Sequence, residues 1–367
     1  MTRLICFIAS GVLCGFASHA GTPPPEPAPL VSPEVHADGR VTFRYDDDEA
    51  ESVEVFGDDH LEGTLTKDAK GIWSVTLGPV KPGIYGYSFG VDENEGMTDP
   101  SNPWSKPARV VDTSILEVPG DKPLLHEFTD VPHGTLHLHE YKSKATRSLR
   151  RLRVYTPPGY DAQGAVRFPV LYLFHGSGDN EATWTDFGRV HLILDNLIAQ
   201  GKAKPMLLVM TDGHADYTQD EGIHKENFIA FEHDLLDSVL PLVDTSYRTQ
   251  ADANGRSVNG LSLGCFQSLY LGINHPDIFA WVGGMSGYVP DAEAMCAKGL
   301  NDPQLNSKLK LLWHSIGRDD FLLEGQKEFE AILEKHHIKR DFHLTEGTHA
   351  WPVWRGYLAE FLPLIFR

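Results

Sequence analysis

The sequence NGLSLG at 259–264 places Ser262 two positions from a glycine on either side. This Gly-x-Ser-x-Gly spacing is typical of a nucleophile elbow, in which the serine occupies a strained turn from a strand into a helix. Glycines are needed because the two backbones pass close together at the turn, where side chains at 260 or 264 would collide. A glycine-rich loop with an incidental serine is the alternative, because so short a motif also arises by chance. Ser262 is therefore a candidate nucleophile if a strand precedes it and a helix follows.

A serine hydroxyl is a weak nucleophile, so it requires a general base and a third group that holds the base. In an α/β-hydrolase these residues follow in the order serine, acid, histidine. Asp319 and Asp320 follow an apolar run that ends at Gly317, and His349 lies between the last predicted strand and the last predicted helix. A surface histidine is the alternative for His349, because the chain has 18 histidines. The order and spacing predict His349 as the base and one of the two aspartates as the acid.

Acyl transfer also requires two backbone N–H groups directed at the developing oxyanion. The amide of Leu263, directly after the nucleophile, is one candidate. The other is expected in the loop His175-Gly176-Ser177-Gly178, where we favour the amide of Ser177 and then that of Gly176. A phosphate-binding loop is the competing interpretation, but the lysine of a P-loop is absent.

These residues must be positioned by a regular alternation of strands and helices. Strands are expected at 170–174, 206–210, directly before the elbow, and at 281–285, 309–316 and 342–344, and helices at 190–198, 228–242, from 263, at 323–336 and from 352. Such alternation predicts a mostly parallel sheet covered by helices on both faces, so the fold class is α/β, with an α/β-hydrolase domain at 134–367. In that arrangement Ser262 follows a strand and opens a helix.

A different pattern precedes this domain. Short alternating runs between 41 and 89, separated by Asp, Gly and Pro, predict a small all-β immunoglobulin-like sandwich at 34–113. An irregular connector is expected at 114–133. Residues 1–20 have the arginine, apolar run and small residues of a signal peptide, and 21–33 form a Pro-rich linker. The apolar run at 4–16 is shorter than the roughly 18 residues that span a bilayer, so the protein is expected to be secreted or periplasmic.

The composition of the chain limits the classes of molecule that it is expected to bind. With 32 Lys and Arg against 51 Asp and Glu, the formal net charge is −19, which disfavours nucleic acids and anionic membranes. A hydrophobic content of 41% is ample for a packed core. Removal of the signal leaves Cys265 and Cys296, so one disulfide is possible and a disulfide framework is not.

The motifs together resemble carbohydrate esterase family one, the feruloyl and acetylxylan esterases, also grouped as esterase-D-like, and 31–113 resembles the early-set sandwich related to glycogen-binding modules. The resemblance implies Asp320 as the acid, because the family pattern Gly-x-x-Asp-Phe ends at Phe321. It also implies hydrolysis, without cofactor or metal, of a feruloyl or acetyl ester on a plant-wall polysaccharide such as xylan. The matching stretches are LYLFHGSGDNE at 171–181, GLSLG at 260–264, GRDDF at 317–321 and HAWPVWR at 349–355.

Four residues are candidates for substrate binding. Trp184 and Trp351 could form an aromatic wall, with Trp354 expected in the core, and Tyr217 lies on a polar loop long enough to shape substrate choice. Cys265 departs from the small residue usual in the family after the elbow, and its bulk could narrow the acyl pocket. It is also readily explained as a buried small hydrophobe.

Three rival functions follow from the same residues. They are a siderophore esterase of the enterobactin type, a secreted acyltransferase, and a carbohydrate-binding protein with a degenerate hydrolase domain. The last is weakened because all three triad positions carry suitable residues. The sandwich aromatics alternate as core residues do, so we expect the sandwich to be a spacer or a brace for the active-site rim rather than a tight glycan binder.

Overall fold

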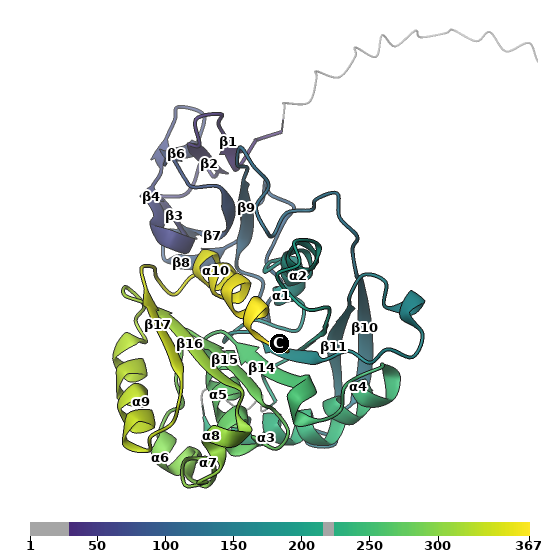
Figure 1. The fold of residues 1–367 in the computed structure, drawn as a ribbon. Coiled ribbons are helices and arrows are strands. Elements are labelled where there is room, and N and C mark those ends of the chain that lie inside the picture. The colour runs from purple at the N-terminus through teal and green to yellow at the C-terminus, as the bar shows by residue number, and fades with distance from the viewer. Residues whose placement is uncertain (1–28, 216–223) are drawn as a thin grey trace, which may run out of the picture.

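The structure is a computed structural model that describes residues 29–215 and 224–367. Figure 1 shows a small β domain standing on a larger α/β domain. The predicted signal peptide, most of the Pro-rich linker and Tyr217 lie outside the described residues.

The N-terminal domain packs two antiparallel sheets against each other. Its core is formed by alternate residues of the strands, among them Phe43, Val55 and Phe89, which are fully buried. The aromatics Tyr45, Trp73, Tyr85 and Tyr87 are buried as well, as their alternation predicts. One sheet has the order β1 (Glu34–Val35), β2 (Val41–Asp46), β6 (Ile72–Leu77), β5 (Thr66–Lys67), and the other β4 (Leu61–Thr64), β3 (Val53–Gly57), β7 (Gly83–Val91), β8 (Asn94–Met97).

A further strand, β9 (Ser114–Val118), pairs with β7 in the second sheet. The sequence analysis assigned these residues to the connector. The strand was missed because its pattern of buried and exposed residues is short and is followed directly by Pro119 and Gly120.

The second domain is built on an eight-stranded sheet. Its six central and C-terminal strands are parallel, while β10 and β11 pair antiparallel at one edge. This agrees with the predicted mostly parallel sheet. The strand order is β10 (Thr135–Lys142), β11 (Leu149–Thr156), β13 (Leu207–Thr211), β12 (Val170–Phe174), β14 (Arg256–Gly260), β15 (Trp281–Met285), β16 (Leu311–Gly317), β17 (Asp341–Thr345).

Helices cover both faces of this sheet, and each face has its own hydrophobic core. The face toward the sandwich carries α1 (Thr183–Asp186), α2 (Val190–Ala199) and α10 (Trp351–Phe361), as Figure 1 shows. The predicted helix at 228–242 is α3 and α4 joined through one π-helical segment, Leu235–Val239. The opposite face carries α3 (Lys225–Asp234), α4 (Leu240–Ser246), α5 (Leu263–Asn274), α6 (Ala292–Met295), α7 (Ala297–Leu300), α8 (Leu305–Lys308) and α9 (Leu323–Lys335).

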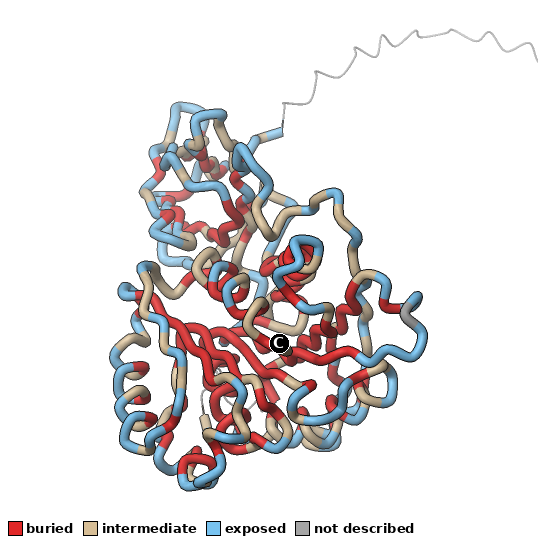
Figure 2. Tube along the Cα trace, viewed as in Figure 1, coloured by how far each residue is buried: buried red, intermediate tan, exposed pale blue. Residues whose placement is uncertain are grey.

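The central strands are enclosed by these layers, as the red strands of Figure 2 show. Every residue of β12 and β13 is buried. This is why their sequences are continuous apolar runs rather than alternating ones. Cys265 and Cys296 are both buried and unpaired, so the disulfide that the sequence allowed does not form.

The two domains meet where α10 packs under the sandwich strand β7. Arg355 of α10 donates a hydrogen bond from Nη1 to the carbonyl oxygen of Ile84 in β7 (2.7 Å) and another from Nη2 to that of Phe187 (2.8 Å). The guanidinium is buried, and burial lowers the pKa of Arg355 to about 10. A single side chain thus ties the sandwich, α10 and the end of α1 together.

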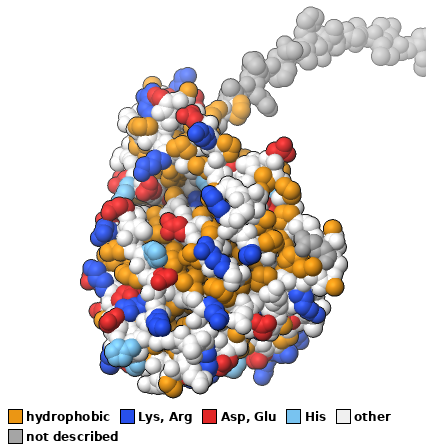
Figure 3. Space-filling model, in the orientation of Figure 1, with side chains coloured by type: hydrophobic (Ala, Val, Ile, Leu, Met, Phe, Trp, Pro, Cys, Tyr) orange, Lys and Arg blue, Asp and Glu red, His pale blue; other side chains and the backbone are white. Residues whose placement is uncertain are grey.

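The surface has no continuous region of one charge on the face shown in Figure 3, where basic and acidic side chains are interspersed. No helix within 29–215 and 224–367 has the length and apolar character needed to cross a membrane.

Candidate active site

Ser262 lies between β14 and α5 with φ 50° and ψ −117°. A positive φ is unfavourable for a residue with a Cβ, costing of order 1–3 kcal/mol, and such strain is typical of functional turns. The turn is held by a hydrogen bond from the Ser262 amide to the carbonyl oxygen of Met285 in the next strand (2.9 Å). Ser262 is 9% exposed, so the residue is largely buried and only a small part of it reaches solvent.

The two glycines of the elbow are required by close backbone contacts. A Cβ at Gly260 would lie 2.5 Å from the carbonyl group of Gly264. One at Gly264 would lie 2.6 Å from the carbonyl oxygen of Phe174, at the end of β12. Real Cβ atoms do not approach this closely, so the motif has the structural role that the sequence analysis gave it.

The imidazole of His349 and the carboxylate of Asp320 form a pair. His349 Nδ1 lies 3.0 and 2.9 Å from the two carboxylate oxygens, and Asp320 is 4% exposed. Burial alone would raise the pKa of Asp320. The hydrogen bond and charge of His349, the Leu322 amide and the Ser286 hydroxyl outweigh burial and lower the pKa of Asp320 below its ordinary value. An N–H at Nδ1 donated to this carboxylate leaves Nε2 without a proton, so Nε2 is able to accept one.

Asp319, the adjacent carboxylate, is exposed, and its amide donates to the carbonyl oxygen of Gly347. Of the two candidate acids, Asp320 is therefore the one that contacts His349. This agrees with the residue implied by the family pattern.

The serine and the His–Asp pair come together around the end of β15. The Ser262 amide binds the carbonyl oxygen of Met285, and the next residue, Ser286, accepts a hydrogen bond from Trp354 Nε1 (2.9 Å). The Trp354 ring in turn lies edge-on to the His349 ring, with centroids 4.8 Å apart. Within the described residues the Ser262 hydroxyl makes no hydrogen bond to His349, and such contacts often shorten only when substrate is bound.

The loop after β12 lies directly against the elbow. A Cβ at Gly176 would be 2.7 Å from Leu261 Cδ1 and 3.6 Å from Ser262 Cβ. Leu263 is the first residue of α5, where a backbone N–H has no partner within its helix. Ser177 is exposed at the tip of the loop. The three predicted oxyanion-hole residues, Leu263, Ser177 and Gly176, thus flank Ser262 or lie in the adjoining loop.

Two buried histidines, His175 and His214, form hydrogen bonds that hold this loop in place. His175 donates from Nδ1 to the carbonyl oxygen of Gly176 (2.8 Å), and its Nε2 accepts from the Gly213 amide (2.8 Å). His214 Nε2 accepts from the Gly178 amide (3.2 Å). Burial is the largest cause that lowers the pKa of His214 to about 4, so this acceptor is neutral at neutral pH. The sequence analysis did not identify either role, because both depend on the neighbouring strand β13 and the loop after it.

Trp184 and Trp351, two of the predicted substrate-binding residues, are buried. Trp184 is 1% exposed and donates from Nε1 to the carbonyl oxygen of Phe174, and Trp351 is 4% exposed and packs edge-on against Trp184. The expectation of an aromatic wall is corrected: Trp351 begins α10 rather than lying on a loop, and both rings belong to the core under the sandwich. Tyr217 lies outside the described residues.

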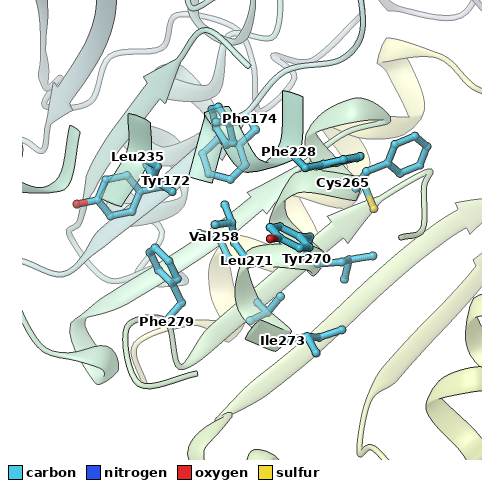
Figure 4. Packing of buried hydrophobic residues seen from close by; sticks show 14 of the residues in the cluster. Tyr172, Phe174, Phe228, Leu235, Val258, Cys265, Tyr270, Leu271, Ile273 and Phe279 are labelled. Atoms are coloured by element: carbon cyan, nitrogen blue, oxygen red, sulfur yellow. The ribbon is translucent and has the colours of Figure 1, made fainter. Parts of the chain in front are cut away.

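Cys265 is also corrected as a pocket residue. It is fully buried in the hydrophobic cluster of Figure 4. A Cβ at Gly284 of β15 would lie 2.6 Å from its Sγ, so the thiol fills the space between α5 and β15. Burial raises the pKa of Cys265 well above the ordinary value, which makes the thiol inert. Cys265 is the buried small hydrophobe that was the alternative.

Phe321 is an aromatic residue that the sequence analysis used only to align the acid. Its side chain is 76% exposed, and its ring centroid lies 4.4 Å from that of His349. Its position directly after the acid, in a loop at a strand end, is the signal that could have identified it as a rim residue.

The described residues contain no cluster of three or more His, Cys, Asp or Glu side chains that could hold a metal ion. A cavity of about 790 Å³ lies between the sandwich and the segment from α1 to Arg189, lined among others by Trp104, Asn102 and Arg189, and no triad residue lines it. The arrangement around Ser262 is suited to nucleophilic acyl transfer.

Comparisons with known proteins identify a family and several relatives. The family described as putative esterase matches residues 143–365. An endo-1,4-beta-xylanase/feruloyl esterase of Xylanibacter ruminicola is 31% identical over 345 residues, which cover 91% of this chain and 46% of that protein. An endo-1,4-beta-xylanase Y of Acetivibrio thermocellus is 23% identical over 59% of this chain and 22% of that protein. The chain thus spans less than half the length of these two curated relatives.

Two solved structures share the fold. A ferulic acid esterase of Anaeromyces mucronatus in complex with ferulic acid has a TM-score of 0.57 at 20% identity, covering 65% of this chain and 93% of that one. The enterobactin esterase of Shigella flexneri has a TM-score of 0.64 at 20% identity, covering 88% of this chain and 92% of that one. The family match extends over more than half of the residues of this chain. The chain therefore belongs to this esterase family.

Proposed function

We propose that this protein is a secreted serine esterase that removes feruloyl or acetyl groups from plant cell-wall polysaccharide such as xylan. The observation that carries the proposal is the strained Ser262 turn beside the loop at Gly176, with His349 bound to the buried Asp320 at the same edge of the sheet. The 31% identity to an endo-1,4-beta-xylanase/feruloyl esterase supports the substrate class.

The reaction proceeds through an acyl-enzyme intermediate. Ser262 Oγ attacks the ester carbonyl carbon while His349 Nε2 accepts the hydroxyl proton, and Asp320 stabilises the resulting imidazolium. The amides of Leu263 and of Ser177 or Gly176 donate to the oxyanion. The imidazolium of His349 then protonates the sugar oxygen as its bond to the acyl carbon breaks, so that the sugar leaves as an alcohol. Water, activated by the same imidazole, releases the carboxylic acid and restores Ser262.

Ser262→Ala tests the mechanism. We expect the substitution to abolish hydrolysis of nitrophenyl acetate while leaving the melting temperature and circular dichroism unchanged. Loss of the nucleophile costs on the order of 10⁶ in turnover in a subtilisin-type triad. Turnover within tenfold of wild type would rule out Ser262 as the nucleophile.

A siderophore esterase of the enterobactin type is the second candidate. One observation favours it: the enterobactin esterase structure aligns with 88% of this chain, more than the α/β domain alone, whereas the ferulic acid esterase aligns with 65%. Parallel assays with methyl ferulate, acetylated xylan and a ferric tri-catecholate lactone distinguish the candidates. Hydrolysis of the lactone alone would show that the substrate is a siderophore and not a polysaccharide. Acyl transfer to an added alcohol in preference to water would indicate an acyltransferase.

A further inference from the structure

The segment between β8 and β9 of the sandwich runs alongside the loop that carries the predicted oxyanion amides. Ala108 and Asp179 form an antiparallel bridge, and the Arg109 amide donates to the carbonyl oxygen of Gly178 (2.8 Å). Thr183 Oγ1 donates to the carbonyl oxygen of Pro107 (2.7 Å). The sandwich thus extends a piece of backbone to the active-site edge of the other domain.

An ion pair reinforces this contact. Lys106 Nζ lies 2.8 Å from Asp179 Oδ1, with the lysine side chain 18% exposed and the aspartate side chain 4% exposed. Burial would lower the pKa of Lys106, but the charge and hydrogen bond of Asp179, with the charges of Asp58 and Asp112, raise it. The Lys106 amide donates to the carbonyl oxygen of Thr113 (2.9 Å), which fixes the base of the side chain in the sandwich segment. The sandwich segment therefore fixes the position of the Lys106 ammonium group beside the carboxylate of Asp179.

Asp179 closes the loop at 175–179 that carries the predicted oxyanion amides of Gly176 and Ser177, which we call the oxyanion loop. Its amide donates to the carbonyl oxygen of Gly176 (3.3 Å), and a Cβ at Gly176 would lie 3.7 Å from Asp179 Oδ2 and 3.6 Å from Ser262 Cβ. The carboxylate that binds Lys106 thus lies over the same glycine that packs against the nucleophile. A shift of Asp179 would move the loop relative to Ser262.

We propose that Lys106 is a positioning residue: by holding Asp179, it sets the distance between the oxyanion amides and the acyl group on Ser262, so that the sandwich completes the active site. Oxyanion donors act over about 2.7–3.1 Å, and the loss of one donor lowers kcat by about 10²–10³. A loop shift weakens a donor without removing it. The inference rests on the serine mechanism proposed above.

Lys106→Met, Asp179→Asn and the double variant test the proposal in the full chain, with nitrophenyl acetate as substrate. We expect kcat to fall by about 10- to 100-fold in each single variant, with KM within about threefold, because oxyanion contacts form mainly in the transition state. In the double variant kcat should fall no further than in either single variant, because all three variants break the same ion pair between Lys106 and Asp179. The affinity for an alkylboronic acid, which mimics the tetrahedral state, should fall in parallel with kcat.

Glu117→Gln is the matched control, because Glu117 in the sandwich pairs with Arg189 of the other domain away from the oxyanion loop. It should retain wild-type kcat. The proposal is overturned if Lys106→Met keeps kcat within threefold of wild type, or if the double variant, which leaves no buried charge unpaired, regains wild-type kcat. Failure of the serine mechanism would instead show as an active Ser262→Ala enzyme.

Discussion

At the residue scale, the two adjacent carboxylates after β16 differ in burial and in partner. Asp320 is buried and binds His349 Nδ1, whereas Asp319 is exposed. The difference matters because a triad acid acts by fixing the tautomer and orientation of the imidazole, which requires a short contact to Nδ1. Only one of two otherwise similar side chains can do this here.

Exchange of each carboxylate for an amide separates them. Asp320→Asn presents the wrong hydrogen-bond partner to His349, a change that costs about 10⁴ in turnover in a serine protease. We expect a loss of about 100-fold or more here, because esters are easier substrates than amides. Asp319→Asn should retain turnover and change stability by at most about 0.5–2 kcal/mol, the range of a lost helix or turn cap. Turnover on one nitrophenyl ester at pH 7.5 and melting temperatures check both. The reverse pattern would move the acid to Asp319.

Phe321 is a second residue whose role can be isolated. Its exposed ring beside His349 could stack on an aromatic acyl group, an interaction worth about 0.5–1.5 kcal/mol. Phe321→Ala should therefore raise KM for methyl ferulate by about 2- to 12-fold, with little change for nitrophenyl acetate. Phe128→Ala is the control, because Phe128 is 74% exposed and stacks on His133. Equal effects of the two substitutions would contradict a role for Phe321 in substrate binding.

At the element scale, the site depends on how closely β12, β14 and α5 approach one another. Much of the order of strands and helices could be predicted because buried strands such as β12 and β13 are short apolar runs and the longer helices have a 3.6-residue period. The elbow and the Ser–Asp–His order followed from that alternation, although the catalytic roles themselves remain predictions. The burial of Trp351 could not be predicted, because it depends on α10 packing beneath a sandwich strand. Arg355 and Ile84, which meet there, are 271 residues apart.

Two glycines in helices, Gly264 and Gly356, allow a controlled test of the close contact between α5 and the end of β12 at the elbow. A Cβ at Gly264 would lie 2.6 Å from one backbone carbonyl oxygen and 2.7 Å from the next, whereas a Cβ at Gly356 in α10 would have no neighbour within 4 Å. Gly264→Ala should lose activity and about 1–3 kcal/mol of stability by overpacking. Gly356→Ala should gain about 0.5–1 kcal/mol, because alanine is the better helix former. Urea unfolding and turnover measure both, and an active, stable Gly264→Ala enzyme would contradict the elbow geometry.

At the scale of the whole molecule, stability should depend on buried histidines that remain neutral. His214 is fully buried, and its pKa falls from 6.5 to about 4. Between these values the unfolded chain binds a proton that the folded chain does not, so unfolding is favoured as the pH falls from 6.5 toward 4. Burial also lowers the pKa of His126 to about 4, and that of His191. His126 and His191 therefore lower the stability of the folded chain as the pH falls, as His214 does.

His214→Gln isolates one of them, since a glutamine oxygen can accept the hydrogen bond from the Gly178 amide. Wild type should lose more stability than the variant between pH 7.5 and 4.5, by on the order of 2–3 kcal/mol. Urea unfolding at both pH values measures the difference. Identical pH dependence in the two proteins would show that His214 titrates normally.

The buried guanidinium of Arg355 has a consequence for how this chain can be divided. Its two hydrogen-bond acceptors are the carbonyl oxygens of Ile84, in the sandwich, and Phe187, in the α/β domain. A chain cut between the domains would remove the Ile84 carbonyl oxygen as an acceptor. The guanidinium of Arg355 would then stay beside the Trp351 ring with one hydrogen bond fewer. Gene shuffling that treats the α/β domain as a portable module would therefore have to replace Arg355 by an apolar residue, or transfer the sandwich with it.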